Sequence, residues 1–118
     1  MINNAIVDKT MDFAVRMVNL YKFLTTDKNE YILSKQILKS GTSIGSNVSE
    51  AQYAQSSSDF LSKSKIALKE AKETEYWLTL LYRTEYVDVA QYNSLNNDLN
   101  EIIKLLVSIC KTVDNKIN

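Results

Sequence analysis

The chain has 118 residues, with 14 basic and 14 acidic side chains, no His, no Pro and a single Cys. This length fits one domain, residues 1–118, which buries enough surface on folding to need neither a metal nor disulfides. Without His the sequence lacks the commonest general base and metal ligand, and its zero net charge removes the long-range attraction typical of nucleic-acid-binding proteins.

Helical periodicity over residues 9–25 predicts the first helix. Asp27, followed three residues later by Glu30, resembles a capping box and predicts that the second helix opens directly afterwards. The apolar face of the first helix repeats every three or four residues. Its members are Thr10, Phe13, Met17, Leu20, Tyr21 and Leu24.

The second helix is expected over residues 28–53, although its middle has the composition of a loop. Residues 40–50, SGTSIGSNVSE, are nearly all small or polar. We expect a helix because Ile44 and Val48 continue the apolar spacing of Leu33 and Ile37.

Two further helices are expected over residues 57–83 and 89–115, opened by Ser57 or Ser58 and by Asp88 respectively. Four amphipathic helices with short connections can bury their apolar faces only against one another. The sequence therefore predicts an all-α fold, an antiparallel up-down four-helix bundle.

The N-terminal sequence and the cysteine content predict a cytoplasmic protein. MINNAIVDKT lacks the basic stretch and apolar run of a signal peptide, and a single Cys cannot form an internal bridge. No apolar stretch approaches the roughly 20 residues of a membrane span, so we expect no membrane partner.

Glu75 is the most obvious candidate for acid–base chemistry, since a helical wheel places it on the inner face of its helix. A buried carboxylate needs partners, which Asn47 and Arg16 are positioned to supply. A polar layer of Asn47, Glu75 and Arg16 that fixes helix register is the simpler interpretation, and we favour it over an active site.

Other catalytic and cofactor patterns are missing. A dimetal site in a bundle normally uses Glu-x-x-His, and SGTSIGSN lacks the Gly-Lys-Ser/Thr ending of a phosphate loop. Cys110 lies on an apolar face, where Cys behaves as a small hydrophobe. We therefore expect no catalytic residues, no cofactor and no metal, and hence no enzyme.

Lysines on the outer faces of the second and third helices are candidates for phosphate contact. Their acidic neighbours also allow a solvated surface with weak ion pairs along the helix. The candidate residues are Lys35, Lys39, Lys63, Lys65, Lys69 and Lys72.

Apolar side chains also lie outside the inner faces of the third and fourth helices. A surplus of this kind usually marks an association surface, and Trp is enriched among interface anchors. The expected oligomer interface comprises Ile66, Tyr76, Trp77, Leu105 and Ile109.

Two stretches of the sequence resemble a known family. They are SxxSIGSNVSEA, which includes Ser43, Asn47 and Glu50, and IALKEAKETEYWLTLL at residues 66–81. The chain is similar to the bacterial four-helix-bundle proteins encoded within ribosomal RNA intervening sequences, which are related to the accessory variability determinant of diversity-generating retroelements. This chain has Gly45 and Ala51 where the family commonly has Pro and Gly.

The resemblance implies a bundle that assembles as a homopentameric ring. It further implies binding to RNA or DNA, or to a nucleic-acid-processing protein. The leading hypothesis is thus a non-enzymatic oligomeric adaptor that acts on structured RNA or beside an RNA-processing enzyme. The alternatives are a protein-interaction module with no nucleic-acid role, which the neutral charge favours, and a small-molecule or catalytic bundle built around Glu75.

Overall fold

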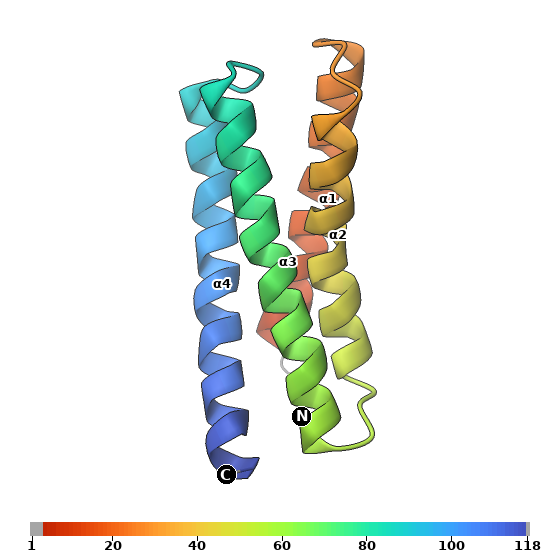
Figure 1. The fold of residues 1–118 in the computed structure, drawn as a ribbon, viewed down its shortest axis with the longest axis vertical. Helices are drawn as coiled ribbons and strands as arrows, with labels where there is room; N and C mark the ends of the chain where they lie inside the picture. The colour runs from red at the N-terminus through yellow and green to blue at the C-terminus, as the bar shows by residue number, and fades with distance from the viewer. Residues whose placement is uncertain (1–3, 118) are drawn as a thin grey trace.

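We describe residues 4–117 of the computed structural model. They form four α-helices, α1 (Asn4–Thr26), α2 (Leu33–Ala51), α3 (Ser57–Arg83) and α4 (Val89–Ile117). Successive helices run in opposite directions, so that the chain forms a rod measuring 47 × 21 × 20 Å (Figure 1). The predicted all-α, up-down four-helix bundle is confirmed.

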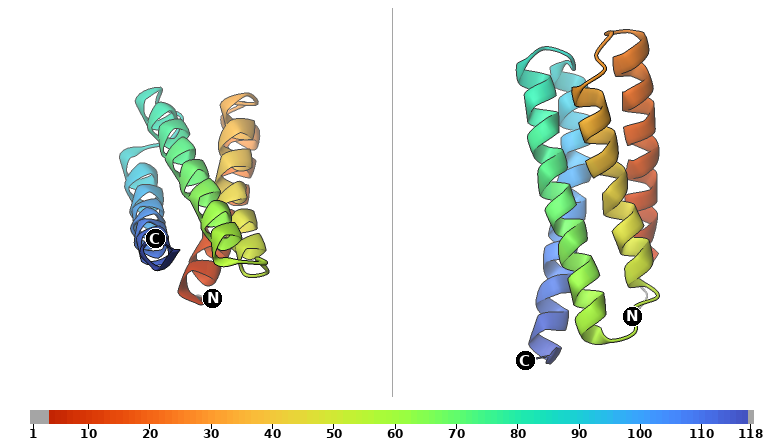
Figure 2. Two further views of the ribbon diagram at one scale, coloured as in Figure 1. Left: turned by 60° about the horizontal axis from the view of Figure 1, so that its bottom comes forward. Right: turned by 45° about the vertical axis from the view of Figure 1, so that its right-hand side comes forward.

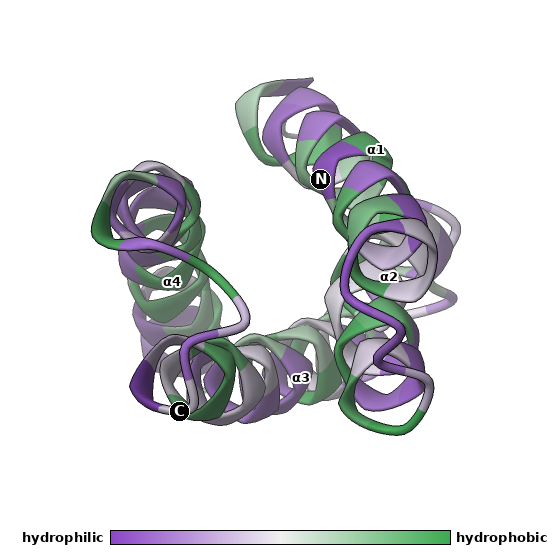
Figure 3. Cartoon of the chain, turned by 90° about the horizontal axis from the view of Figure 1, so that it is seen from above, coloured by the Kyte–Doolittle hydropathy of each residue, from purple (hydrophilic) through white to green (hydrophobic). Residues whose placement is uncertain are grey.

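The helices follow one another around the bundle. The α1–α2 and α3–α4 connections lie together at one end, and the α2–α3 connection lies at the other (Figure 2). Viewed along the rod, α1 and α4 stand at the two ends of an arc, and α1 is diagonally opposite α3 (Figure 3). Among neighbouring pairs, α1 and α4 contact each other least.

The core is built from the faces that the sequence periodicity identifies. Phe13, Met17 and Leu24 of α1 meet Ile37 and Ile44 of α2 in one continuous apolar cluster. The larger helices α3 and α4 complete it with Ala67, Ala71, Leu78, Leu81, Leu95, Leu99, Ile102 and Leu106. None of the described helices is long and apolar enough to cross a membrane.

The first connection differs from the predicted one. Helix α2 begins at Leu33 rather than near residue 28, because the carboxylate of Glu30 accepts hydrogen bonds from the backbone N–H groups of Ile32, Leu33 and Ser34 at 3.2, 3.0 and 2.6 Å. The predicted capping box between Asp27 and Glu30 is therefore wrong. Glu30 satisfies the exposed N–H groups of α2 without Asp27.

The other helix starts are closer to expectation. Ser56, rather than Ser57 or Ser58, caps α3 by accepting a hydrogen bond from the N–H of Asp59 at 3.0 Å. Asp88 opens α4 as predicted, and it exchanges two hydrogen bonds with Gln91 in a capping box. Helix α1 begins at Asn4, earlier than predicted, since Ile6 extends its buried face by one turn.

The small residues of α2 explain why a loop-like composition forms a helix. A Cβ atom at Gly41 would overlap the Met17 side chain, and one at Gly45 would lie 3.2 Å from the carbonyl oxygen of Thr10. Because Gly41 and Gly45 have no side chains, α1 can approach α2 closely at these positions. The helix is thus stabilised by packing against α1 rather than by its own propensity.

Candidate functional site

The polar layer predicted from Asn47, Glu75 and Arg16 does not form. Asn47 donates to the Ser43 carbonyl oxygen in its own helix at 2.8 Å. Glu75 is partly exposed and pairs with Lys72 at 3.4 Å, and Arg16 pairs with Asp98 on α4. The inner face of α3 is centred on Thr74, which leaves Glu75 at its edge.

The buried polar contact between α2 and α3 joins Ser40 and Thr74 instead. Their hydroxyl oxygens lie 2.9 Å apart, and both residues are fully buried. Thr74 also donates to the carbonyl oxygen of Glu70 at 2.8 Å. The sequence signal for this pair was the run of small hydroxyl residues in α2, which permits a close approach between helices.

Ion pairs connect α1 to α4, the neighbouring helices that contact each other least. Arg16 Nη1 donates to Asp98 Oδ2 at 2.6 Å and to the Ser94 carbonyl oxygen at 3.2 Å. Two helical turns earlier in α1, Lys9 Nζ lies 2.8 Å from Glu101 Oε2, and this hydrogen bond raises the pKa of Lys9. The ion pairs of Arg16 and Lys9 therefore connect α1 to α4 on the side of the bundle where neighbouring helices contact each other least.

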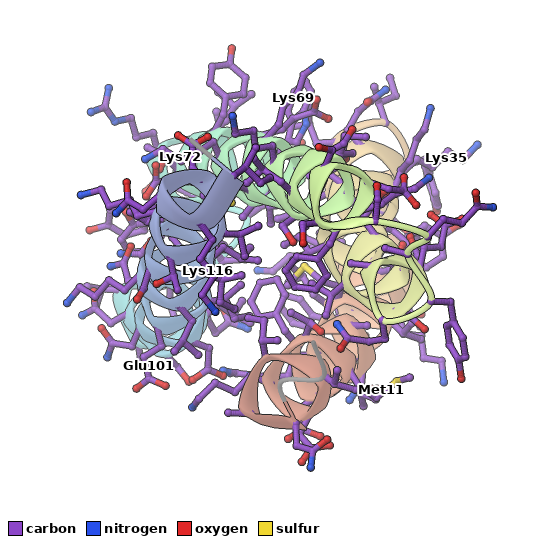
Figure 4. All side chains as sticks on the ribbon, turned by 90° about the horizontal axis from the view of Figure 1, so that it is seen from below. Met11, Lys35, Lys69, Lys72, Glu101 and Lys116 are labelled. Carbon is purple, nitrogen blue, oxygen red and sulfur yellow. The ribbon has the colours of Figure 1, made fainter. Side chains whose placement is uncertain are left out.

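The six candidate lysines come from two neighbouring helices, α2 and α3. Lys35 projects from α2, whereas Lys69 and Lys72 project from α3 (Figure 4). Lys63 lies 4.0 Å from Glu50 and Lys72 lies 3.4 Å from Glu75, so carboxylates partly neutralise both. The side chains of Lys35, Lys39, Lys65 and Lys69 are exposed and form no ion pair with another residue in 4–117.

The predicted interface residues divide by exposure. Ile66 and Tyr76 on α3 are 41% and 63% exposed. Trp77, Leu105 and Ile109 are only partly buried, and they pack against the core of their own bundle. Trp77 is held by an edge-to-face contact with Tyr76, with ring centroids 5.1 Å apart.

A second exposed apolar stripe lies on α1, and it was not among the predicted interface residues. Met11 and Val15 are 63% and 53% exposed, and Val18 follows on the same face. Val7, Met11 and Ala14 also line a groove of about 290 Å³ between α1 and α2, together with the small residues Thr42, Gly45, Ser46 and Ser49. The spacing of 11, 15 and 18 is itself helical, so a search for second stripes would have found this face.

Cys110 is placed for packing rather than for reaction. Cys110 is buried, and burial raises the pKa of its thiol, which disfavours the reactive thiolate. Within the described residues, no three Cys, Asp or Glu side chains gather into a set that could hold a metal ion.

Comparison with known proteins identifies relatives over nearly the whole chain. Residues 3–108 match the family described as 23S rRNA-intervening sequence protein. A crystal structure of a protein of unknown function from the S23 ribosomal protein family of Bacteroides thetaiotaomicron VPI-5482 is 62% identical, with a TM-score of 0.91. The similarity covers 92% of this chain and 96% of that one. No curated protein matches the chain.

Proposed function

Because the chain belongs to the family of 23S rRNA-intervening sequence proteins, we propose that it is a cytoplasmic, non-enzymatic adaptor that assembles as a homopentamer and binds structured RNA. The observation that carries the proposal is the pair of uncovered apolar faces on α1 and α3. Met11, Val15 and Val18 form the first face, and the exposed Ile66 and the partly buried Trp77 form the second. Apolar side chains outside the core are typical of association surfaces.

The placement of the two faces suits a ring. A ring with one kind of contact needs two different faces on each subunit, so that the first face of one copy meets the second face of the next. Met11 projects from α1 on the side of the bundle opposite Lys69 of α3 (Figure 4). The groove beside Met11 is lined by small residues, which leaves room for a side chain of the neighbouring copy. The number five follows from the family resemblance.

The lysines of α3 supply the contacts to RNA phosphates. Lys65 and Lys72 are seven residues apart and share one line along the helix, whereas Ile66 and Trp77 are eleven apart and share another. Tyr76 is eleven residues from Lys65 and lies on the basic line, so a neighbouring copy that covers the line of Ile66 and Trp77 leaves the lysines exposed. A ring repeats these lysines around its outside, and multivalency strengthens contacts that are weak in one subunit.

The test measures both the RNA affinity and the oligomer mass of each variant. Lys65, Lys69 and Lys72 are changed together to Glu, and binding to a structured RNA is measured at low and high salt. As a matched control, Lys104, Lys111 and Lys116 of α4 are changed to Glu, since they are exposed and carry the same charge. We expect the α3 variant to lose binding at unchanged mass, and the wild-type affinity to fall steeply as salt rises.

Two results would reject parts of this proposal. Loss of both mass and affinity in the α3 variant would assign its lysines to assembly rather than to RNA. No RNA binding by a wild-type oligomer would leave the chain as a protein-interaction module, which its zero net charge also suits.

A further inference from the structure

A large hollow lies at the end of the rod that carries the α1–α2 and α3–α4 connections. Its volume is about 750 Å³, within the range of small-ligand sites. Phe23 comes from α1 and Lys28 from the first connection, and the remaining residues come from the end of α3, the α3–α4 connection and the start of α4. These are Tyr82, Arg83, Glu85, Tyr86, Val87, Asp88, Val89 and Gln91.

A smaller hollow of about 260 Å³ adjoins the first and shares Phe23 and Gln91 with it. It follows the side of the bundle between α1 and α4, the neighbouring helices that contact each other least, and it reaches Arg16. Together the two hollows form a groove that leads from the connections down the open side of the rod. We call it the end groove.

Aromatic side chains give the end groove flat, apolar walls. Phe23, Tyr82 and Tyr86 line it. The ring of Tyr82 is stacked on Tyr92, with centroids 4.6 Å apart and an interplanar angle of 23°. Tyr82 remains 37% exposed, so Tyr92 fixes its orientation without covering it. A fixed, partly open aromatic ring is a platform for stacking a planar ligand.

Two cations stand beside these rings without a carboxylate partner. Lys28 and Arg83 form no ion pair with another residue in 4–117. Lys28 Nζ lies 5.8 Å from the centre of the Phe23 ring, which is at the limit of a cation–π contact. The pair is available to an anionic group on a ligand whose ring stacks nearby.

The two carboxylates of the end groove have different roles. Asp88 is engaged at the start of α4, where its Oδ1 accepts the N–H of Gln91 at 2.7 Å. Glu85 has no such partner among the described residues. A free carboxylate beside two cations suits a ligand that carries hydrogen-bond donors, such as ribose hydroxyls, as well as an anionic group.

The backbone at Glu85 is strained. Its φ is 67°, in the left-handed region that favours Gly, and it stands where the chain leaves α3. The N–H groups of Glu85 and Tyr86 bond the carbonyl oxygens of Tyr82 and Leu81 in a Schellman arrangement. A charged residue at a position that Gly would fill at lower cost indicates a role for its side chain.

We infer that the end groove binds a single nucleotide, with its base stacked on Tyr82, its phosphate held by Lys28 and Arg83, and its ribose hydroxyls facing Glu85. The nucleotide is either an unpaired residue of RNA or a free nucleoside monophosphate. Binding of an unpaired RNA nucleotide rests on the proposed function. In that case the end groove is a site for unpaired bases, in addition to the sequence-tolerant phosphate contacts of the α3 lysines.

Three probes distinguish the sources. They are an RNA hairpin with 2-aminopurine in its loop, a fully paired duplex with the same stem sequence, and AMP. Lys28 and Arg83 are changed together to Gln, and Lys104 and Lys111 of α4 are changed to Gln as the matched control. Tyr82→Leu removes the stacking ring and keeps an apolar side chain. Circular dichroism of each variant confirms that it remains folded.

We expect the hairpin to bind the wild type at least tenfold more tightly than the duplex, with quenched 2-aminopurine fluorescence. The Lys28/Arg83 variant should lose this preference, and its salt slope should fall by roughly 0.7 for each phosphate contact removed. Tyr82→Leu should abolish the quenching, whereas the α4 control should behave as the wild type. Competition by AMP with the same dependence on Lys28 and Arg83 would identify a free nucleotide as the ligand.

The inference is overturned if the wild type binds neither the hairpin nor AMP, or if the Lys28/Arg83 variant binds both as the wild type does. Its failure is distinguishable from that of the proposed function. Loss of all RNA binding on reversal of the α3 lysines, with no effect of the end-groove variants, would retain the proposed function alone. The reverse pattern would retain the end groove and reject the α3 lysines as the RNA contact.

Discussion

Glu30 is the residue whose local chemistry most directly determines where a helix begins. Burial by itself raises the pKa of its carboxyl group, but hydrogen bonds from the backbone N–H groups of Leu33, Ser34 and Ile32 outweigh burial and leave the pKa below its ordinary value. Those bonds stabilise the charged form, and they satisfy donors that the start of α2 would otherwise leave unpaired. The folded state therefore favours ionised Glu30.

We predict that Glu30→Gln lowers the free energy of unfolding by about 1 kcal/mol at pH 7. Because the folded-state pKa is lowered, this contribution is complete above the ordinary Glu pKa of roughly 4.3 and is lost as the pH falls through the folded-state value. Urea denaturation should show the gap between wild type and variant narrowing from pH 7 to pH 3. A gap of equal size at both pH values would contradict the account.

Asp27→Asn is the matched control for this prediction, since Asp27 is exposed and its side chain takes no part in the cap of α2. We expect its free energy of unfolding to remain within about 0.5 kcal/mol of the wild-type value.

The pairing of α1 with α2 is the element-scale feature that depends most on small residues. Gly41 faces Met17, and the Met17 side chain is fully buried. A methyl group at Gly41 must displace packed atoms, which typically costs about 1–3 kcal/mol, against a helix-propensity gain of about 1 kcal/mol. Close contact between the helices therefore outweighs the intrinsic penalty of Gly in a helix.

Gly41→Ala should thus reduce stability by up to about 2 kcal/mol, although Ala is the better helix former. Thermal unfolding followed by circular dichroism measures the change. Gln36→Ala, at an exposed position of the same helix outside the groove beside Met11, is the control, and it should leave the midpoint unchanged or slightly raised. A more stable Gly41→Ala protein would show that α1 does not approach α2 as closely as described.

The sequence predicts the helices better than it predicts which polar groups meet. The apolar periodicity of α1 to α4 is a strong signal, because it is repeated over several turns of each helix. Glu75 was placed inward from its position between Ala71 and Leu78, yet the face of α3 turns toward Thr74 and its contact with Ser40. A helical wheel drawn for α3 alone does not include the rotation of the helix about its axis that packing against neighbouring helices imposes.

The same limit applies to the candidate sites. The lysines of α3 were correctly expected on an outer face, since their spacing alone sets them apart from the buried positions. The end groove was not predicted because Phe23, Lys28 and Tyr82 come from segments far apart in the chain. Only the topology, which brings both connections to one end, makes them neighbours (Figure 2).

At the scale of the whole molecule, the central claim is that α1 and α3 carry two complementary faces of a head-to-tail assembly. Val15→Glu places a charge on the first face and Ile66→Glu on the second. Each variant should be a monomer by itself, because each retains one intact face and a contact needs two different ones. Ser108→Glu, at an exposed position of α4, is the control and should assemble normally.

Mixing the two variants should restore one contact. The intact α1 face of the Ile66→Glu chain can meet the intact α3 face of the Val15→Glu chain, which gives a dimer that cannot grow further. Contacts between identical faces would instead let each variant dimerise by itself, through the face that it retains. This result would reject the head-to-tail arrangement even if the wild type is oligomeric.

Multi-angle light scattering of the wild-type protein at micromolar concentration tests the central claim most directly. The account predicts a single species with five times the 13.5 kDa mass of the chain. A species of 13.5 kDa would contradict it, because Met11, Val15 and Ile66 would then be exposed on a stable monomer.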